Sequence, residues 1–328
     1  MPLCIIKLCL AVIEGRQEWI ISITRNMFSS HFAGLGLYLS QLTIESSMKK
    51  TVLVTGCSTG IGRCVAYGLR DKGYVVYPTA RRQDDLQALI DDGFEAIALD
   101  YSDSDSVESA FNELMQKTSG ELYAVFHNGA YGQPGAVEDL TRSALEAQFS
   151  CNVFGWHQLN NLILPIMRQQ GYGRIVINSS VLGIIALPMR GAYNASKFAL
   201  EGLFDTLRLE LKNTGIFVSI IEPGPIATEF RANAKKAFEE HIYNNKVILA
   251  NSAHRQYYEK TIKRLAHKGK VDPFTLPPES VLKRVEHALM SDKPKIRYPV
   301  TVPTYVLSFL KRVLPHRGLD WILLKLAK

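Results

Sequence analysis

From residue 50 onward, the sequence alternates between short apolar runs and longer segments of helical periodicity. The short runs, rich in β-branched residues, predict strands at 51–55, 74–79, 94–98, 122–127, 174–179, 216–221 and 296–299. The longer segments predict helices near 61–72, 83–92, 103–118, 141–169 and 191–213. Consecutive parallel strands need a crossover helix, so this alternation predicts an α/β fold with a doubly wound parallel sheet.

Composition places the chain among ordinary globular proteins. Apolar residues make up 47% of the sequence and charged residues 21%, which excludes a largely disordered or fibrous chain. No apolar run reaches the roughly 18 residues that a membrane-spanning helix needs. The five cysteines include no Cys-x-x-Cys pair, so neither a disulfide framework nor a metal site is expected. A reducing cytoplasm is the simplest compartment.

A glycine-rich segment follows the first predicted strand directly. Residues 55–62 read TGCSTGIG, which places Gly56, Gly60 and Gly62 at the spacing G-x-x-x-G-x-G. Glycines at such a turn let the backbone approach a pyrophosphate, whose charge then faces the helix N-terminus. A purely structural turn is the alternative, but the position at the head of a βαβ unit favours a Rossmann-type dinucleotide site.

The end of the second predicted strand distinguishes between the two nicotinamide cofactors. An acidic residue there binds the ribose hydroxyls of NAD, whereas a basic residue pairs with the 2′-phosphate of NADP. Here the strand leads into Arg81 and Arg82, with no acid at its tip. We therefore predict NADP(H), with Arg81 as the main phosphate partner. Arg82 is either a second partner or a solvated residue at a helix start. Asp100, after the third strand, is placed to meet the adenine edge.

A tyrosine and a lysine lie four residues apart in the segment YNASK at 193–197. On a helix, Tyr193 and Lys197 share one face, and a nearby ammonium group favours the phenolate of a tyrosine. Ser180 ends a predicted strand upstream, and Asn152 lies on the preceding helix. The YxxxK pattern alone occurs by chance, but together with Ser180 and the glycine turn it indicates acid–base chemistry.

With these segments together, the chain resembles the short-chain dehydrogenase/reductase family. The matching residues are TGCSTGIG, Asp100, Asn128-Gly129-Ala130, Asn152, Ser179-Ser180, YNASK and PGPIAT at 223–228. Within the family, the sequence looks most similar to bacterial NADP-dependent aldehyde reductases and to the retinol and 17β-hydroxysteroid dehydrogenase branch. It departs from the usual Asn-Asn-Ala-Gly in having HNGA at 127–130. His127 is expected to pack at a strand end.

The resemblance implies a role for each matching residue. Tyr193 is the general acid in carbonyl reduction and the base in alcohol oxidation. Lys197 binds the nicotinamide ribose and lowers the pKa of Tyr193. Ser180 hydrogen-bonds the substrate oxygen, and Asn152 holds a water in a proton relay. The residues expected at the cofactor are Gly56, Ser58, Thr59, Gly60, Ile61, Gly62, Arg81, Arg82, Asp100, Asn128, Gly129, Tyr193, Lys197, Pro223, Gly224, Ile226 and Thr228.

Three segments divide the chain. Residues 48–228 are expected to form the dinucleotide-binding catalytic core, and residues 229–328 a helical substrate-binding lid and a basic amphipathic tail of the same domain. Residues 1–47 lack clean periodicity, and we interpret them as a non-native or disordered extension. Translation would then begin at Met48 or Met27; a short membrane-associating leader is the alternative.

Apolar residues around the predicted site favour a hydrophobic substrate. The candidate contacts are Leu182, Leu187, Met189 and Phe230, with Ile184, Phe238, Tyr257 and Tyr258 as further lining residues. Core packing is the alternative for each of them. We expect a hydrophobic aldehyde or ketone, such as a long aldehyde, a retinal-like molecule or a sterol ketone. The helices at 141–169 and 191–213 resemble those of the family's subunit interface, which implies a homodimer or homotetramer.

Charge is unevenly distributed along the sequence. Residues 231–328 hold 20 basic and eight acidic residues, while the whole chain has a net charge of +7. A solvated surface is the favoured interpretation, and no nucleic-acid partner is expected; peripheral contact of the tail with an anionic membrane is an alternative. Two further functions stay open: a membrane-associated reductase of lipid-derived or retinoid aldehydes, and a non-catalytic NADP-sensing module. A sensing module would be expected to lack the tyrosine or the lysine.

Overall fold

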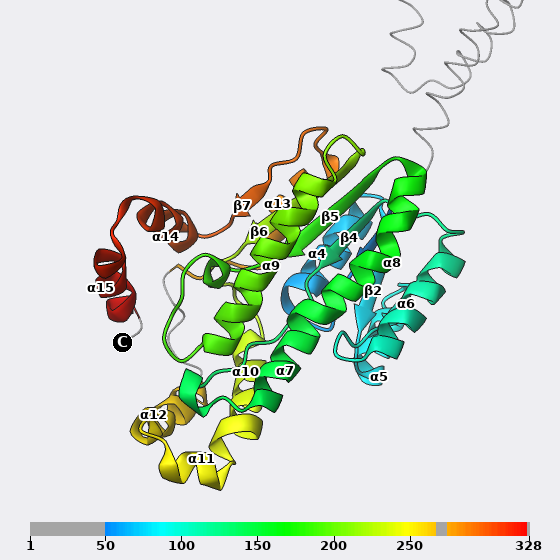
Figure 1. Cartoon of the computed structure of the whole chain (residues 1–328). Coiled ribbons are helices and arrows are strands. Elements are labelled where there is room, and N and C mark those ends of the chain that lie inside the picture. Colours follow the sequence, from blue (N-terminus) through cyan, green and yellow to red (C-terminus); the bar gives the residue numbers. More distant parts are fainter. Residues whose placement is uncertain (1–49, 267–273, 327–328) are drawn as a thin grey trace, which may run out of the picture. The chain divides into compact units, whose positions relative to one another are not determined.

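The centre of the molecule is a parallel sheet. The computed structural model describes residues 50–266 and 274–326, so the interpretation of residues 1–47 lies outside it. Within the described residues, seven strands lie in the order β3-β2-β1-β4-β5-β6-β7 (Figure 1). They are β1 (Thr51–Val54), β2 (Val75–Ala80), β3 (Ile97–Ala98), β4 (Ala124–His127), β5 (Gly173–Asn178), β6 (Ile216–Glu222) and β7 (Arg297–Pro299). The predicted doubly wound α/β fold is confirmed.

Helices cover both faces of this sheet. One face carries α4 (Gly60–Asp71), α5 (Gln83–Asp91) and α13 (Glu279–Met290). The other face carries α6 (Ser104–Lys117), α8 (Gly155–Gln170) and α9 (Gly191–Glu210). Strands between two helical layers bury both of their faces, which explains why they read as nearly continuous apolar runs. Trp156 of α8 and Phe204 of α9 are among the largest buried side chains of the second layer.

The single helix predicted over 141–169 is three consecutive segments. These are α7 (Arg142–Phe149), a π-helical turn η2 (Ser150–Phe154) and α8. A π turn inserts an extra residue into the helical repeat, so the periodicity of one straight helix does not describe it. Directly after it, Gly155 approaches Tyr101 so closely that a Cβ atom would lie 2.1 Å from the Tyr101 carbonyl oxygen. The prediction of one regular helix is therefore wrong at the turn that carries Asn152.

The predicted lid region is helical. It consists of α10 (Phe230–Phe238), a π-helical turn η4 (Glu239–Tyr243), α11 (Lys246–Asn251) and α12 (Arg255–Ala266). Phe238 and Tyr258 are buried in the core of this region rather than lining a pocket. The Tyr258 hydroxyl accepts a hydrogen bond from the Ala136 amide at 2.9 Å and donates to Asp139, which fastens α12 to the loop after β4.

Two further helices follow β7. They are α14 (Val302–Val313) and α15 (His316–Leu326), and Figure 1 shows α14 following β7 with α15 beyond it. Their buried residues, Leu307, Leu319 and Leu323, form one cluster with Leu182 and Ile185. No helix among the described residues is long and apolar enough to cross a membrane.

The close approach at Gly155 generates a stability prediction. Gly155→Ala is expected to lower the free energy of unfolding by about 1–3 kcal/mol, because the new methyl group overlaps the Tyr101 carbonyl. The matched control is Gly202→Ala on α9, where a Cβ atom would meet nothing within 4 Å. This control should raise the free energy of unfolding by about 0.5–1 kcal/mol. Urea titration measures both; equal effects of the two substitutions would contradict the packing argument.

Candidate active site

The turn between β1 and α4 is shaped by its glycines. Gly56 and Gly60 have φ angles of +68° and +59°, a backbone conformation that other residues adopt only with strain. At Gly62, a Cβ atom would lie 2.2 Å from the Gly56 carbonyl oxygen. The helix N-cap, Thr59, makes no side-chain hydrogen bond, and the first turn of α4 contains no acidic residue. The N–H groups at this helix start are therefore available to an anion.

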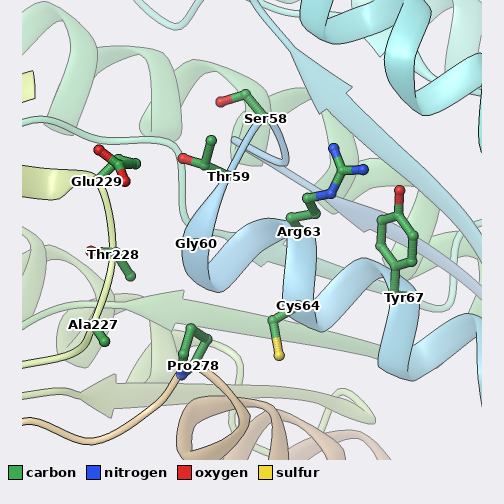
Figure 2. Close-up of a pocket in the computed structure, with 10 residues that line it drawn as sticks. All are labelled: Ser58, Thr59, Gly60, Arg63, Cys64, Tyr67, Ala227, Thr228, Glu229 and Pro278. Atoms are coloured by element: carbon green, nitrogen blue, oxygen red, sulfur yellow. The ribbon is translucent and has the colours of Figure 1, made fainter.

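A cavity of about 620 Å³ opens beside this turn (Figure 2). Its lining residues are Ser58, Thr59, Gly60, Arg63, Cys64, Tyr67, Ala227, Thr228, Glu229 and Pro278. A Cβ atom at Gly60 would lie 2.9 Å from Thr228 Cγ2, so the glycine turn and the segment after β6 are in close contact. The glycine turn after β1 and the PGPIAT segment after β6, which are far apart in the sequence, thus line the same cavity. The cavity and the open helix start fit the phosphates of a dinucleotide.

The segment PGPIAT is held in place from both sides. The Pro223 carbonyl accepts a hydrogen bond of 2.8 Å from the Val181 amide, directly after Ser180. A Cβ atom at Gly224 would lie 2.1 Å from Thr301 Oγ1, so only glycine fits here without a shift. Ile226 forms a β-bridge with Leu276. These contacts fix the approach of the segment to the strand ends.

Asn128 connects the ends of three strands. Its Nδ2 donates to the carbonyl oxygens of Thr55 at 3.0 Å and Gly56 at 3.2 Å. Its Oδ1 accepts a hydrogen bond of 2.8 Å from Asn178. The Thr55 hydroxyl in turn accepts from the amides of Asn128 and Gly129 at 2.9 and 3.1 Å. One asparagine therefore sets the relative positions of the loops after β1, β4 and β5.

His127, the departure from the family pattern, is a packing residue as predicted. It is fully buried and stacks on Trp156, with 5.4 Å between the ring centroids. Burial lowers the pKa of His127 to about 3, so its ring is neutral. Its Nδ1 lies 2.8 Å from the Tyr101 hydroxyl.

The two arginines at the tip of β2 differ in their partners. Arg82 makes a bidentate ion pair with Asp85 of α5, with distances of 2.7 and 2.9 Å. Arg81 lies 3.7 Å from Asp100, a long ion pair, and 66% of its side chain is exposed. Asp100 also accepts hydrogen bonds from the backbone amide and hydroxyl of Ser102. Arg81 is thus the arginine whose guanidinium is free to bind a further anion.

The structure brings Ser180, Tyr193 and Lys197 together at the carboxyl ends of the strands. Ser180 follows β5, while Tyr193 and Lys197 lie one turn apart on α9. Burial raises the pKa of Tyr193 to about 12, and a hydrogen bond with Ser180 partly offsets this rise. The hydroxyl therefore stays protonated at neutral pH.

Lys197 is almost completely buried, at 1% exposure. Its Nζ donates a hydrogen bond of 2.8 Å to the Asn178 carbonyl and lies 4.7 Å from the Trp156 ring and 5.8 Å from the Tyr193 ring. Burial lowers the pKa of Lys197 to about 7, although the negative charge of Glu201 raises this pKa in part. Near neutral pH the Lys197 amine is therefore only partly protonated.

Asn152 reaches this group through an intermediate residue. Its Nδ2 donates to the Tyr131 carbonyl at 2.9 Å and to Ser196 Oγ at 3.1 Å, and its Oδ1 accepts from the Tyr131 amide at 3.2 Å. The side chain is thus engaged by protein partners, and the Ser196 hydroxyl links it to α9 by donating a hydrogen bond of 2.8 Å to the Tyr193 carbonyl. Its predicted contact with a water stays a prediction.

A charged cluster behind Lys197 was missed in the sequence. Arg297 of β7 contacts three carboxylates: Glu222 at 2.6 Å, Glu201 and Asp205. Glu201 and Glu222 are buried. Burial raises the pKa of Glu201, while the charge of Arg297 lowers it. A signal was present for Glu201, which lies four residues after Lys197 and therefore on the same helix face.

The candidate substrate contacts divide among three places. Phe230 packs against Tyr193, with 5.3 Å between the ring centroids. Leu182, at 8% exposure, and Leu187 pack in the cluster with α14 and α15. Met189 packs in the core of the lid region. Tyr193 also packs against the cluster of Leu182 and Leu187, so Met189 is the one of these four candidates that the structure places with other residues than Tyr193. Among the described residues, no three metal-ligating side chains gather into a site.

Comparison with known proteins places this arrangement in a family. The family model of the short chain dehydrogenases matches residues 50–239. The oxidoreductase YbbO of Escherichia coli is 42% identical over 276 residues, which cover 84% of this chain and 94% of that protein. Human 17-beta-hydroxysteroid dehydrogenase type 1 is 32% identical and covers 77% of this chain and 78% of its own.

The fold also matches a solved structure. A short-chain dehydrogenase/reductase of Burkholderia phymatum, in complex with NAD, superposes with a TM-score of 0.67 at 22% identity. The match covers 83% of this chain and 95% of that one. The family model and the Escherichia coli relative show that the chain belongs to the short-chain dehydrogenase/reductase family, whose members are oxidoreductases that use NAD or NADP.

Proposed function

We propose that this protein is an NADP(H)-dependent reductase of hydrophobic aldehydes or ketones, with alcohol oxidation as the reverse reaction. The observation that carries the proposal is the group formed by half-buried Ser180 and Tyr193 and fully buried Lys197, at the strand ends that also hold the glycine turn. When bound, NADPH supplies a hydride to the carbonyl carbon; the protein supplies position, electrostatic stabilisation and a proton. The glycine turn, Thr228 and Arg81 would hold the cofactor.

In this proposal, Tyr193 donates its proton to the carbonyl oxygen as negative charge develops there. A hydroxyl with a pKa of about 12 keeps its proton at neutral pH, which suits the reductive direction. The Ser180 hydroxyl stabilises the same oxygen. When the Lys197 amine is protonated, its positive charge makes Tyr193 a stronger acid. Oxidation requires the phenolate instead, so its rate should rise with pH through the alkaline range.

Arg81 supports NADP(H) over NAD(H). Its guanidinium is largely exposed at the tip of β2, where the 2′-phosphate would lie, whereas Arg82 is paired with Asp85. A guanidinium binds a phosphate through charge-assisted hydrogen bonds. The NAD seen in the Burkholderia structure belongs to that protein, and the residues at this strand tip favour the phosphorylated form here.

The apolar surroundings of Tyr193 support a hydrophobic substrate. The Phe230 ring covers one side of the tyrosine, and the segment after Ser180 is apolar. Human 17-beta-hydroxysteroid dehydrogenase type 1, a relative, is named for a steroid substrate. We propose a long-chain, retinal-like or sterol carbonyl compound on this basis.

The reductase proposal predicts the result of one substitution. Purified protein with NADPH and a panel of long-chain and retinoid aldehydes should oxidise the cofactor, and Tyr193→Phe should lower kcat at least about 100-fold. The control is Tyr172→Phe, which lies directly before β5, at the opposite end of that strand from Ser180, and it should turn over as the wild type does. Tight NADPH binding without turnover across the panel would instead indicate a sensing module.

Cofactor choice is tested by the two arginines. Arg81→Ala should raise KM for NADPH by about 10–100-fold, because it removes a charged hydrogen-bond donor from the phosphate, and should leave KM for NADH unchanged. Arg82→Ala should change either constant by less than about threefold, because Arg82 is already paired with Asp85. Steady-state kinetics with both cofactors measures this. Equal losses in the two variants would refute the assignment to Arg81.

The charge behind Lys197 predicts a pH dependence. Glu201→Gln removes a carboxylate that favours the ammonium form, so the pKa of Lys197 should fall further below its ordinary value. Carbonyl reduction, which declines as Lys197 deprotonates, should then lose activity at pH 7, with its midpoint moved to lower pH by roughly one unit.

Asp205→Asn is the matched control for that pH profile. It also removes one carboxylate partner from Arg297, but Asp205 is not among the groups that shift the pKa of Lys197. Its kcat profile should keep the wild-type midpoint even if its melting temperature falls. A similar shift of the midpoint in both variants would contradict the assignment of the effect to the Glu201 carboxylate.

A further inference from the structure

The two helices at the end of the chain carry a large apolar surface on their outer side. Eight large apolar residues of α14 and α15 are between 48% and 63% exposed. They are Val302, Tyr305, Val306, Phe309, Val313, Trp321, Leu324 and Leu326. A single exposed apolar residue is ordinary, but eight of them on two consecutive helices mark an interaction surface.

The exposed residues of α14 recur at helical spacing. Val302, Tyr305, Phe309 and Val313 are three or four positions apart and therefore lie along one side. The opposite side, which includes Leu307, packs inward against the segment after Ser180. An α-helix with apolar residues on both sides is normally covered on both sides. Among the described residues, nothing buries the outer side of α14.

Basic residues flank this apolar side. Arg312, Arg317 and Lys325 are exposed, and Arg312 and Arg317 have no carboxylate partner within the described part of the chain. The sequence of the two helices contains one acidic residue, Asp320. The Lys325 ammonium lies 3.6 Å from the centroid of the Trp321 ring. The surface therefore combines aliphatic side chains, two exposed aromatic amphipathic side chains and a positive charge.

We propose that the outer side of α14 and α15 docks on an anionic lipid bilayer. Apolar and aromatic side chains on one helix side, with Lys and Arg beside them, are the features of helices that lie in a membrane interface. The positive charge complements anionic headgroups. A second copy of the chain is a poorer occupant, because a symmetric contact would bring the same basic residues against each other.

Docking would place the candidate active site beside the bilayer. The inner sides of α14 and α15 contribute Leu307, Leu319 and Leu323 to the cluster that holds Leu182, two residues after Ser180. One helical layer would thus separate the lipid from the loop that carries Ser180. The importance of this position rests on the proposed function, because it matters only for a substrate that dissolves in lipid. The docking itself does not depend on the proposed function.

Vesicle binding tests the docking without any substrate. The full chain is sedimented with vesicles of phosphatidylcholine alone and of a two-to-one mixture with phosphatidylglycerol. We expect binding to the anionic vesicles, weakened by salt, and little binding to the neutral ones. Phe309→Ser with Trp321→Ser, and Arg312→Glu with Arg317→Glu, should each weaken this binding by at least about tenfold.

Control pairs lie on exposed positions elsewhere. Val247→Ser with Met290→Ser removes apolar residues that are 71% and 64% exposed, and Lys283→Glu with Lys293→Glu reverses two exposed charges. Both pairs should bind anionic vesicles as the wild type does, and NADPH titration of every variant confirms that it is folded. Equal binding by all variants, or no binding to anionic vesicles, would overturn the proposal. So would a loss of dimer in the Phe309→Ser, Trp321→Ser variant without any vesicle binding, which would assign the surface to a second copy.

Discussion

The candidate site depends on a lysine ammonium group buried in the protein interior. Burial disfavours the charge on Lys197, and the surrounding fold compensates for it in part. The Asn178 carbonyl accepts a hydrogen bond from Lys197, the Trp156 ring lies beside the ammonium group, and the Glu201 carboxylate favours its charged form. Glu201 can be kept in the core only because Arg297 pairs with it. The last strand of the sheet thus supports the chemistry at the centre of α9.

Local sequence predicts the parts of this structure that local physics determines. The alternation of apolar strands and amphipathic helices predicted the parallel sheet, because each strand buries both faces. The glycine turn was recognisable because Gly56 and Gly60 adopt φ angles that favour glycine. Tyr193 and Lys197 were recognisable because four residues span about one helical turn. Each of these features depends on residues that are close in the chain.

Features that depend on distant residues were missed. Arg297 and Glu201 are 96 residues apart, and no periodicity links them. The π turn at Asn152 has no marker in a pattern that otherwise reads as one helix. Phe238 and Tyr258 were candidate pocket residues, but Tyr258 bonds to Ala136 and Asp139 and closes the core of the lid region. Apolar character alone does not distinguish a pocket wall from a core.

The most direct measurement follows an isotope through the reaction. NADPH deuterated at the transferable position of the nicotinamide is incubated with the full chain and a long-chain aldehyde, and the alcohol is analysed by mass spectrometry. A Tyr193–Lys197 pair that serves hydride transfer predicts one deuterium on the carbinol carbon, and a loss of at least about 100-fold in rate in Lys197→Met. Alcohol without deuterium, or an unchanged rate in Lys197→Met, would contradict this chemistry.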